Sequence, residues 1–412
     1  MKQTGEVPAL TDPLNVCLEK KAPSDLPEAP RSVGWTSPKR VVLADQANPL
    51  LLDCGVNLAP VTVEYETYGR LSPARDNAVF ILHALSGDAH AAGWDRDYVV
   101  DNRPWRRERP GWWDEMIGPG KAFDTDGFYV VCANILGSCY GTTGPWSPNP
   151  ENEGKPYGLD FPVVTVEDWV RLQVRLQDYL GIEQLLAVVG GSLGGQQALA
   201  WAISYPNRIK SVIILAASAR IGAQGLAFNA VGRQAILNDP CFNRGNYYSS
   251  GAPTGGLELA RMLGHITYLS ADSMEGKFGR RYQNGKQPCY RLSNEFMVES
   301  YLSHQGRSFV NRFDANSYLY LSRAMDYYDA AAHGEGDLEA ACAAIRADLL
   351  LISYSSDWLY PPEATRAVAE AVLAAGHPVS YIEIPSSYGH DAFLLETEKT
   401  APLIDSFLRR GA

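Results

Sequence analysis

The strongest chemical signal in the chain is the run GGSLGG at residues 190–195. It follows an apolar stretch, 185–189, that is typical of a buried strand, and it precedes a helical pattern, 194–205. A G-x-S-x-G motif between a strand and a helix is typical of a nucleophile elbow, a sharp turn in which small residues flank the reactive serine. Without these neighbours the run would fit a glycine-rich turn with a solvated serine equally well. The context therefore predicts that Ser192 is a catalytic nucleophile.

A serine hydroxyl needs a general base and an orienting carboxylate before it becomes a useful nucleophile. In the α/β-hydrolase order the acid follows the serine and the histidine comes last, each in a loop after a strand. Asp357 follows the predicted strand 348–353, and His390 lies in a Gly-His loop after the last predicted strand, 380–384. We therefore predict the triad Ser192, Asp357 and His390, in which the histidine accepts the serine proton and the aspartate orients the imidazole.

Negative charge that develops on the attacked carbonyl oxygen requires two backbone N–H donors. The residue after the nucleophile, Leu193, and the loop after an early strand usually supply them, which assigns the second donor to Leu85. The same loop contains His83, Asp88 and His90, so a metal site is a less favoured alternative there. We expect an oxyanion hole at this loop and no metal.

Apolar runs of strand length alternate with longer amphipathic patterns from residue 41 onward, as in a parallel sheet covered on both faces. The expected strands are 61–67, 78–83, 129–133, 185–189, 211–216, 348–353 and 380–384, with helices at 166–180, 194–205 and 362–375. The alternation stops between 221 and 340, where the pattern becomes all-helical. We predict an α/β-hydrolase fold, mostly parallel, with an inserted helical cap over the carboxyl ends of the strands. The expected division is a flexible tail at 1–40, a core at 41–220, the cap at 221–340 and the rest of the core at 341–412.

Composition restricts the class of protein. The chain has 412 residues, of which 46% are apolar and 20% charged, and this excludes a disordered or fibrous chain. Lys plus Arg number 36 and Asp plus Glu 47, so the net charge of −11 disfavours nucleic-acid and membrane partners. No apolar run approaches the roughly 20 residues of a membrane helix, and no secretory signal is visible, so we expect a cytoplasmic protein. The seven cysteines show no CxxC spacing, which disfavours disulfides and structural zinc.

Ten motifs resemble those of the MetX-type acyltransferases, the homoserine O-acetyltransferase family, and the resemblance extends from about residue 42 to residue 408. They are LHALSGDAH at 82–90, GWWD at 111–114, GPGK at 118–121, NILGS at 134–138, GGSLGGQ at 190–196, LARM at 259–262, ITY at 266–268, VESYL at 298–302, RFDAN at 312–316 and GHDAF at 389–393.

This resemblance implies transfer of an acetyl group from acetyl-CoA to the hydroxyl of L-homoserine, a step toward methionine. The reaction would pass through an acyl-serine by a ping-pong mechanism, with acetyl-CoA as a substrate and no permanently bound cofactor. By the same resemblance, Arg261 and Asp391 match the positions that hold the carboxylate and the ammonium of the amino acid, and Tyr268 is a further expected contact. The family also implies a homodimer formed through the helical cap.

Three single features leave alternatives open. An arginine-rich stretch at 95–110 interrupts the family pattern and could attract CoA phosphates or form a solvated loop. Succinyl-using relatives often carry an arginine where Leu359 stands, and serine-acylating relatives tend to have proline where Gly87 stands, so both positions favour acetyl transfer to homoserine. A homoserine O-succinyltransferase, a serine O-acyltransferase, or a serine esterase or thioesterase is the alternative activity, and a catalytically inactive binding module is the most remote alternative.

Overall fold

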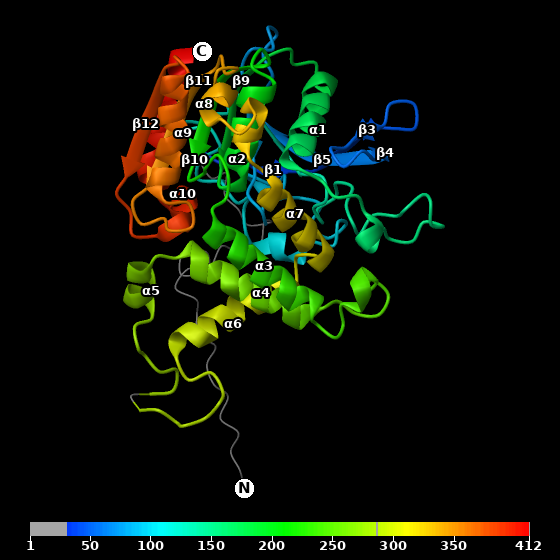
Figure 1. Cartoon of the computed structure of the whole chain (residues 1–412), viewed down its shortest axis with the longest axis vertical. Helices are drawn as coiled ribbons and strands as arrows, with labels where there is room; N and C mark the ends of the chain where they lie inside the picture. The colour runs from blue at the N-terminus through cyan, green and yellow to red at the C-terminus, as the bar shows by residue number, and fades with distance from the viewer. Residues whose placement is uncertain (1–30, 286, 412) are drawn as a thin grey trace.

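A computed structural model describes residues 31–285 and 287–411. Its centre is an eight-stranded sheet in the order β12-β11-β10-β9-β6-β8-β5-β2 (Figure 1). The pairs β2–β5 and β5–β8 are antiparallel, and the others are parallel. These strands are β2 Lys39–Ala44, β5 Val61–Tyr68, β6 Ala78–Leu82, β8 Tyr129–Ala133, β9 Leu185–Gly191, β10 Ile209–Leu215, β11 Asp348–Tyr354 and β12 Val379–Ile384. The predicted mostly parallel sheet is therefore correct.

Helices cover both faces of this sheet because successive residues of a strand point to opposite sides. On β9, Val188 belongs to an apolar cluster that includes Trp201, whereas Val189 belongs to a second cluster that includes Leu408. The core helices are α1 Val166–Tyr179, α2 Leu193–Ser204, α8 Leu338–Cys342, α9 Pro362–Ala374, α10 Ala392–Leu395 and α11 Thr397–Gly411. A capping box at Thr165 and Asp168 fixes the start of α1.

The cap is a run of helices inserted between β10 and β11. It consists of α3 Ala223–Leu237, α4 Thr254–Tyr268, α5 Ala271–Lys277, α6 Met297–Val310 and α7 Ala315–Tyr327. Figure 1 shows α3, α4 and α6 below the sheet, with α7 between them and the core. The cap therefore lies against the loops that follow β9, β11 and β12.

The N-terminal boundary differs from the prediction. The short strand β1 Trp35–Thr36 pairs with β7 Trp94–Asp95, and β2 begins at Lys39 and pairs with β5. Residues 31–40 therefore belong to the fold rather than to a tail, because their partners are distant strands that local sequence does not reveal. The remainder of the predicted tail, 1–30, lies outside the described residues. The other short elements are β3 Leu50–Leu51, β4 Asn57–Leu58, and the 3₁₀ turns η2 Pro104–Glu108, η3 Gly158–Asp160, η4 Asn243–Gly245, η5 Ala330–Gly334 and η6 Gly389–Asp391.

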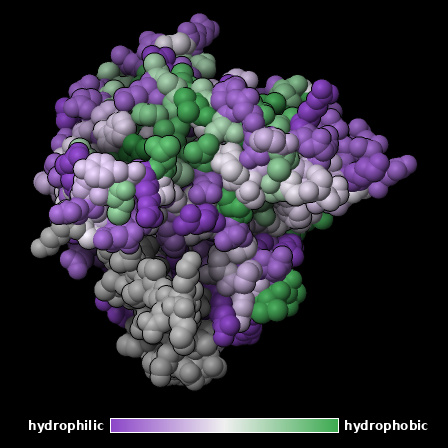
Figure 2. All heavy atoms as spheres, turned by 90° about the horizontal axis from the view of Figure 1, so that it is seen from below, coloured by the Kyte–Doolittle hydropathy of each residue, from purple (hydrophilic) through white to green (hydrophobic). Residues whose placement is uncertain are grey.

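Three further observations concern the helices, the cysteines and the surface of this fold. Within the part of the chain that the structure describes, no helix is long and apolar enough to cross a membrane, and every cysteine is free. Seen from below, the end that carries the cap, apolar side chains gather in the middle of a mixed surface (Figure 2). The cap end is therefore not uniformly polar.

Candidate active site

The nucleophile sits on a strained turn between β9 and α2. Ser192 has φ 58° and ψ −125°, a backbone conformation that a residue with a Cβ rarely adopts and that is often found at active sites. The turn leaves no room for larger neighbours: a Cβ on Gly190 would lie 2.2 Å from the Gly194 carbonyl carbon, and a Cβ on Gly194 would lie 2.0 Å from the Leu82 oxygen. The predicted elbow is therefore present, and its glycines have a steric reason.

The three residues of the predicted triad are in hydrogen-bond contact. Ser192 Oγ lies 2.8 Å from His390 Nε2, and His390 Nδ1 lies 2.7 Å from Asp357 Oδ2. With a neutral imidazole, the serine hydroxyl donates to Nε2 and Nδ1–H donates to the carboxylate, a tautomer that follows from the hydrogen-bond pattern. All three side chains are buried. The arrangement can remove a proton from Ser192 without a rearrangement.

Asp357 is itself held in place by the backbone after β11. Its Oδ1 accepts the N–H groups of Leu359 at 3.0 Å and Tyr360 at 2.9 Å. Burial alone would lower the pKa of His390, but the Asp357 carboxylate overrides it and raises that pKa above its ordinary value. The aspartate therefore stabilises the imidazolium that forms when the histidine accepts a proton.

The two predicted oxyanion donors lie next to the nucleophile. Leu193 is the first residue of α2, so its N–H has no intrahelical acceptor. Leu85 follows β6 and lines the same small pocket as Ser192. This pocket has a volume of about 40 Å³ and is otherwise lined by a mixture of apolar and neutral polar side chains, chiefly from α3, α4, α7 and the loop after β11. Leu85 and Leu193 therefore both lie beside Ser192, and their role as oxyanion donors stays a prediction.

The loop after β6 is fixed by protein partners at each of its polar side chains. His83 Nε2 accepts the Ile135 N–H at 3.2 Å, and burial lowers the pKa of His83, so the ring is neutral. His90 Nδ1 lies 3.1 Å from Glu66 Oε1, while Asp88 pairs with an arginine. The alternative of a metal site receives no support from these contacts, because the three groups face different partners.

Part of the arginine-rich stretch has a role that neither sequence interpretation foresaw. Arg106 donates to Asp88 at 2.6 Å and to Asp95 at 2.7 Å, and Arg103 donates to both oxygens of Glu64 at 2.6 and 2.9 Å. Both guanidinium groups are buried, so they form neither a solvated loop nor an accessible phosphate site. Burial favours a neutral Asp88, but Arg106 holds the pKa of Asp88 at about 2. This ion pair braces the loop that carries Leu85.

Arg261 from the cap and Asp391 from the core bring opposite charges near His390. Arg261 Nη1 lies 3.4 Å from Ser86 Oγ, and its guanidinium stacks 4.6 Å from the centre of the Phe309 ring. Neither Arg261 nor Asp391 makes an ion pair within the described residues. Burial raises the pKa of Asp391, although His390 and Arg261 oppose this shift. An amino acid with a carboxylate and an ammonium would satisfy both groups.

Tyr268 connects the cap to the triad. Its ring centre lies 6.2 Å from that of His390 and 5.5 Å from the Arg261 guanidinium carbon, and it lines the pocket of Ser192. The loop that carries His390 packs tightly against the cap: Gly389 has φ 72°, and a Cβ there would lie 2.5 Å from the Ser270 nitrogen. This loop can therefore pack against the cap only if residue 389 is glycine.

Sequence reasoning did not assign a role to Arg312, although the residue lies inside one of the family motifs. Its Nη1 donates to the Ser86 carbonyl at 3.1 Å and to the Tyr140 hydroxyl at 2.9 Å. It thus ties the start of α7 to the residue next to Leu85. No local signal distinguishes such an arginine, because both of its acceptors are more than 170 positions away.

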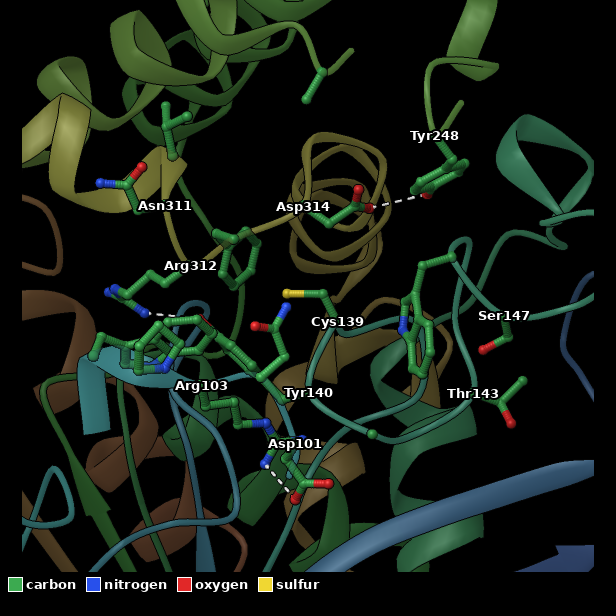
Figure 3. A pocket seen from close by; sticks show the side chains of 18 of the residues that line it. Asp101, Arg103, Cys139, Tyr140, Thr143, Ser147, Tyr248, Asn311, Arg312 and Asp314 are labelled. Atoms are coloured by element: carbon green, nitrogen blue, oxygen red, sulfur yellow. Dashed lines mark hydrogen bonds and ion pairs between the residues drawn. The ribbon is translucent and has the colours of Figure 1, made fainter. Parts of the chain in front are cut away.

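A much larger cleft, of about 1,020 Å³, is lined in part by Arg312 and Tyr140 (Figure 3). Asp314 occupies its wall and accepts the Tyr248 hydroxyl at 3.2 Å. Ser192 does not line this cleft. This cleft is therefore separate from the pocket of Ser192.

Comparison with known proteins agrees with this geometry. Residues 77–397 match the model of the alpha/beta hydrolase fold family. The chain is 50% identical over 382 residues to a homoserine O-succinyltransferase of Acidithiobacillus ferrooxidans, which covers 92% of this chain and 97% of that protein. It is 48% identical over 378 residues to a homoserine O-acetyltransferase of Methanohalobium evestigatum, covering 92% of this chain and 74% of that protein.

Solved structures give the same picture. A homoserine O-acetyltransferase from Bacillus anthracis has a TM-score of 0.81 at 30% identity and covers 90% of this chain and 97% of that one. The esterase E22 has a TM-score of 0.80 at 31% identity and covers 90% of this chain and all of its own. The same fold therefore carries both transfer to an alcohol and transfer to water.

Proposed function

The chain belongs to the homoserine O-acyltransferases of the α/β-hydrolase family, and we propose that it transfers the acetyl group of acetyl-CoA to the hydroxyl of L-homoserine. The products would be O-acetyl-L-homoserine and CoA, and the proposed role is a step of methionine biosynthesis carried out in the cytoplasm. One observation carries this proposal: the hydrogen-bonded triad Ser192, His390 and Asp357 opens into a small pocket. Arg261 and Asp391 lie near the triad and make no ion pair with any residue that the structure describes.

The choice of acetyl rests on the lining of the acyl pocket. Relatives of both names are about half identical to this chain over the aligned residues, so overall identity does not select the donor. Leu359 lines the pocket together with apolar side chains such as Leu263 and Met325, and none of the described residues that line it is a cation. A succinyl carboxylate would be buried there without a cation to neutralise it, which is costly, whereas an acetyl methyl group carries no charge.

In the first half of the reaction, Ser192 Oγ attacks the thioester carbonyl of acetyl-CoA while His390 Nε2 accepts the serine proton. The tetrahedral oxyanion is stabilised by the N–H groups of Leu193 and Leu85. When the C–S bond breaks, the CoA sulfur takes the proton from the imidazolium and leaves as a thiol. An acetyl-serine and a neutral His390 remain, and Asp357 stabilises the transient positive charge.

In the second half, homoserine enters with its carboxylate toward Arg261 and its ammonium toward Asp391. His390 then removes the proton of the γ-hydroxyl, whose oxygen attacks the acetyl-serine carbonyl. Collapse of the intermediate returns the proton to Ser192 Oγ and releases the acetyl ester. Because water could attack the same ester, positioning of the acceptor by two opposite charges gives homoserine the advantage of proximity.

We also propose that two copies of the chain associate through their caps. Apolar side chains on the outer faces of α3 and α4 are well exposed, with Val231 at 59%, Leu259 at 56% and Ile266 at 40%. Exposed apolar surface of this kind marks an interaction site when it is contiguous. The measurement is the mass of the protein in solution by light scattering, and a monomer at micromolar concentration would contradict the proposal.

The decisive assay measures CoA release from acetyl-CoA or succinyl-CoA, each with homoserine, serine or no acceptor. We expect turnover with acetyl-CoA and homoserine only, and none with the Ser192→Ala variant. Release without an acceptor would make the protein a thioesterase or esterase, the second candidate, which its likeness to the esterase E22 favours. A preference for succinyl-CoA or for serine would contradict the interpretation of Leu359 or of Gly87.

A further inference from the structure

Three positively charged residues lie at the end of the short helix α5 and just after it. Lys277, Arg280 and Arg281, called here the basic segment, make no ion pair with any described residue. This is unusual in a chain with a net charge of −11, where exposed arginines such as Arg208 and Arg366 pair with carboxylates at 2.5 and 3.0 Å. Unpaired cations in an acidic protein create a local positive potential that attracts anions.

The inner member of the basic segment is Lys277, the last residue of α5. Its Nζ is buried and has no hydrogen-bond partner among the described residues. A buried ammonium group without an acceptor is costly, so the position calls for an acceptor that the chain does not supply. The two outer members are exposed: Arg280 lies over the Phe296 ring at 5.5 Å, and Arg281 Nε donates to the Phe278 carbonyl at 3.0 Å.

Side-chain contacts join the basic segment to the catalytic chamber. Phe278 packs 4.8 Å from the Tyr301 ring centre, and the Tyr301 hydroxyl lies 3.1 Å from His265 Nδ1. His265 lies one helical turn after Arg261, so both are on the same face of α4. His265 Nε2 is also buried without a partner among the described residues, and burial lowers the pKa of His265 to about 2, so the ring is neutral.

The other end of α5 is fixed to the catalytic loop. Ser270 caps α5 and its Oγ donates to the Ser387 carbonyl, three residues before His390. Lys277 is near enough to Asp391 for its charge to oppose the rise in the pKa of that carboxyl. The basic segment therefore runs from the surface along the cap to the flank of the acceptor site.

The charges of the two substrates indicate which one the basic segment serves. Homoserine carries one carboxylate and one ammonium, and Arg261 and Asp391 already match them. Acetyl-CoA, the proposed donor, carries several negative charges, all on its phosphate groups. The residues of the triad offer no positively charged partner for these phosphates. The large cleft is a poorer candidate because its Arg40 and Arg103 both pair with Glu64, at 2.8 and 2.6 Å. Its third arginine, Arg312, already donates to the Ser86 carbonyl and the Tyr140 hydroxyl.

We propose that Lys277, Arg280 and Arg281 bind the phosphate groups of the acyl-CoA donor while its thioester reaches Ser192. This inference rests on the proposed function, because it requires a CoA thioester as the donor. Charge-assisted hydrogen bonds from arginine and lysine are the usual means of phosphate recognition. The basic segment would then act on binding of the donor and leave the chemical steps unchanged.

The test compares acetyl-CoA with S-acetyl-pantetheine, which has the same thioester and no nucleotide phosphates, at saturating homoserine. We expect Arg280→Gln and Arg281→Gln each to raise the KM for acetyl-CoA about two- to fivefold, the effect of an exposed charge pair. Lys277→Gln should raise it about tenfold, because its ammonium is buried. The KM for S-acetyl-pantetheine should not change in any of the three, and added salt should shrink the differences seen with acetyl-CoA.

The matched control is Arg323→Gln, which removes one charge from an exposed arginine elsewhere on the cap and should alter neither KM. Arg40→Gln tests the large cleft: an increase in KM there, with none in the basic segment, would overturn the proposal. Equal losses with both donors, or a Lys277→Gln effect only on the KM for homoserine, would also overturn it. If the wild-type protein acetylated homoserine with neither donor, the proposed function itself would fail. Circular dichroism establishes that each variant is folded.

Discussion

Leu359 donates its backbone N–H to Asp357 Oδ1 at 3.0 Å, while its side chain lines the pocket that contains Ser192. One residue thus serves two parts of the site through different atoms. The backbone contact orients the carboxylate of the triad, and the side chain sets the polarity of the acyl pocket. A substitution can therefore change the acyl pocket without removing the hydrogen bond that supports catalysis.

The first prediction follows from this separation. Leu359→Arg should raise the ratio of kcat/KM for succinyl-CoA to that for acetyl-CoA by at least about tenfold, because a charge-assisted hydrogen bond contributes about 1.5–3 kcal/mol. Activity with acetyl-CoA should fall but persist. Steady-state kinetics with both donors measure the ratio, and Leu359→Met is the control that keeps the pocket apolar. An unchanged ratio in a folded Leu359→Arg variant would show that the acyl group does not bind in this pocket.

The second prediction concerns Asp357. Asp357→Asn should lower kcat about 10,000-fold, because the imidazole then adopts the wrong tautomer. It should also move the acidic limb of the pH profile. His390 acts as a base only when it is neutral. The raised pKa of His390 therefore places the acidic limb of the wild-type profile above pH 6.5, the ordinary pKa of histidine.

Without the carboxylate, burial still lowers the pKa of His390, and the limb should move to lower pH in the Asp357→Asn variant. The profile of kcat/KM against pH measures this shift. A limb at the same pH in both proteins would show that His390 is not the titrating base.

The third prediction concerns recognition of the acceptor. Arg261→Lys keeps the charge but loses the planar fork that suits a carboxylate, so the KM for homoserine should rise about tenfold. Acylation of Ser192 precedes binding of homoserine and should not change. A rapid-quench measurement of the first burst of CoA, made without acceptor, separates the two steps. An equal loss in the burst would place Arg261 on the donor side.

The fourth prediction concerns the brace under the oxyanion loop. Arg106→Met leaves Asp88 and Asp95 buried without their partner, and this should lower the free energy of unfolding by about 3–5 kcal/mol. The exposed pair of Arg366 and Glu383 provides the control, since Arg366→Met should cost less than about 1 kcal/mol. Urea unfolding at neutral pH measures both values.

The same pair predicts a pH dependence. The pKa of Asp88 is lowered from 3.8 to about 2 in the folded protein, so its contribution to stability is present above pH 3.8 and is lost as the pH falls toward 2. The difference between wild type and Arg106→Met should therefore be largest near neutral pH and shrink below about pH 4. A difference that is independent of pH would contradict an ionic origin.

Much of the catalytic centre could be inferred from the sequence, since its components are local. A strand, a glycine-rich turn and a helix are neighbours in the chain, so the elbow at Ser192 is visible as a motif. Asp357 and His390 could be found because each follows a strand in the expected order. The helical interruption between two strands indicated the cap in the same way. These inferences needed only periodicity, turn chemistry and chain order.

Only the tertiary structure decided which charged groups are satisfied and which are left for a ligand. Arg106 and Arg280 are both arginines near other arginines in the sequence, yet Arg106 is buried between two carboxylates, whereas Arg280 is exposed and makes no ion pair with any described residue. The strands at 35–36 and 39–44 likewise depend on partners far along the chain. Side-chain type determines which chemistry is possible, but the cost or benefit of a charge depends on neighbours that long-range packing supplies. For that reason the sequence alone predicted the triad, whereas the fold was needed to locate the basic segment.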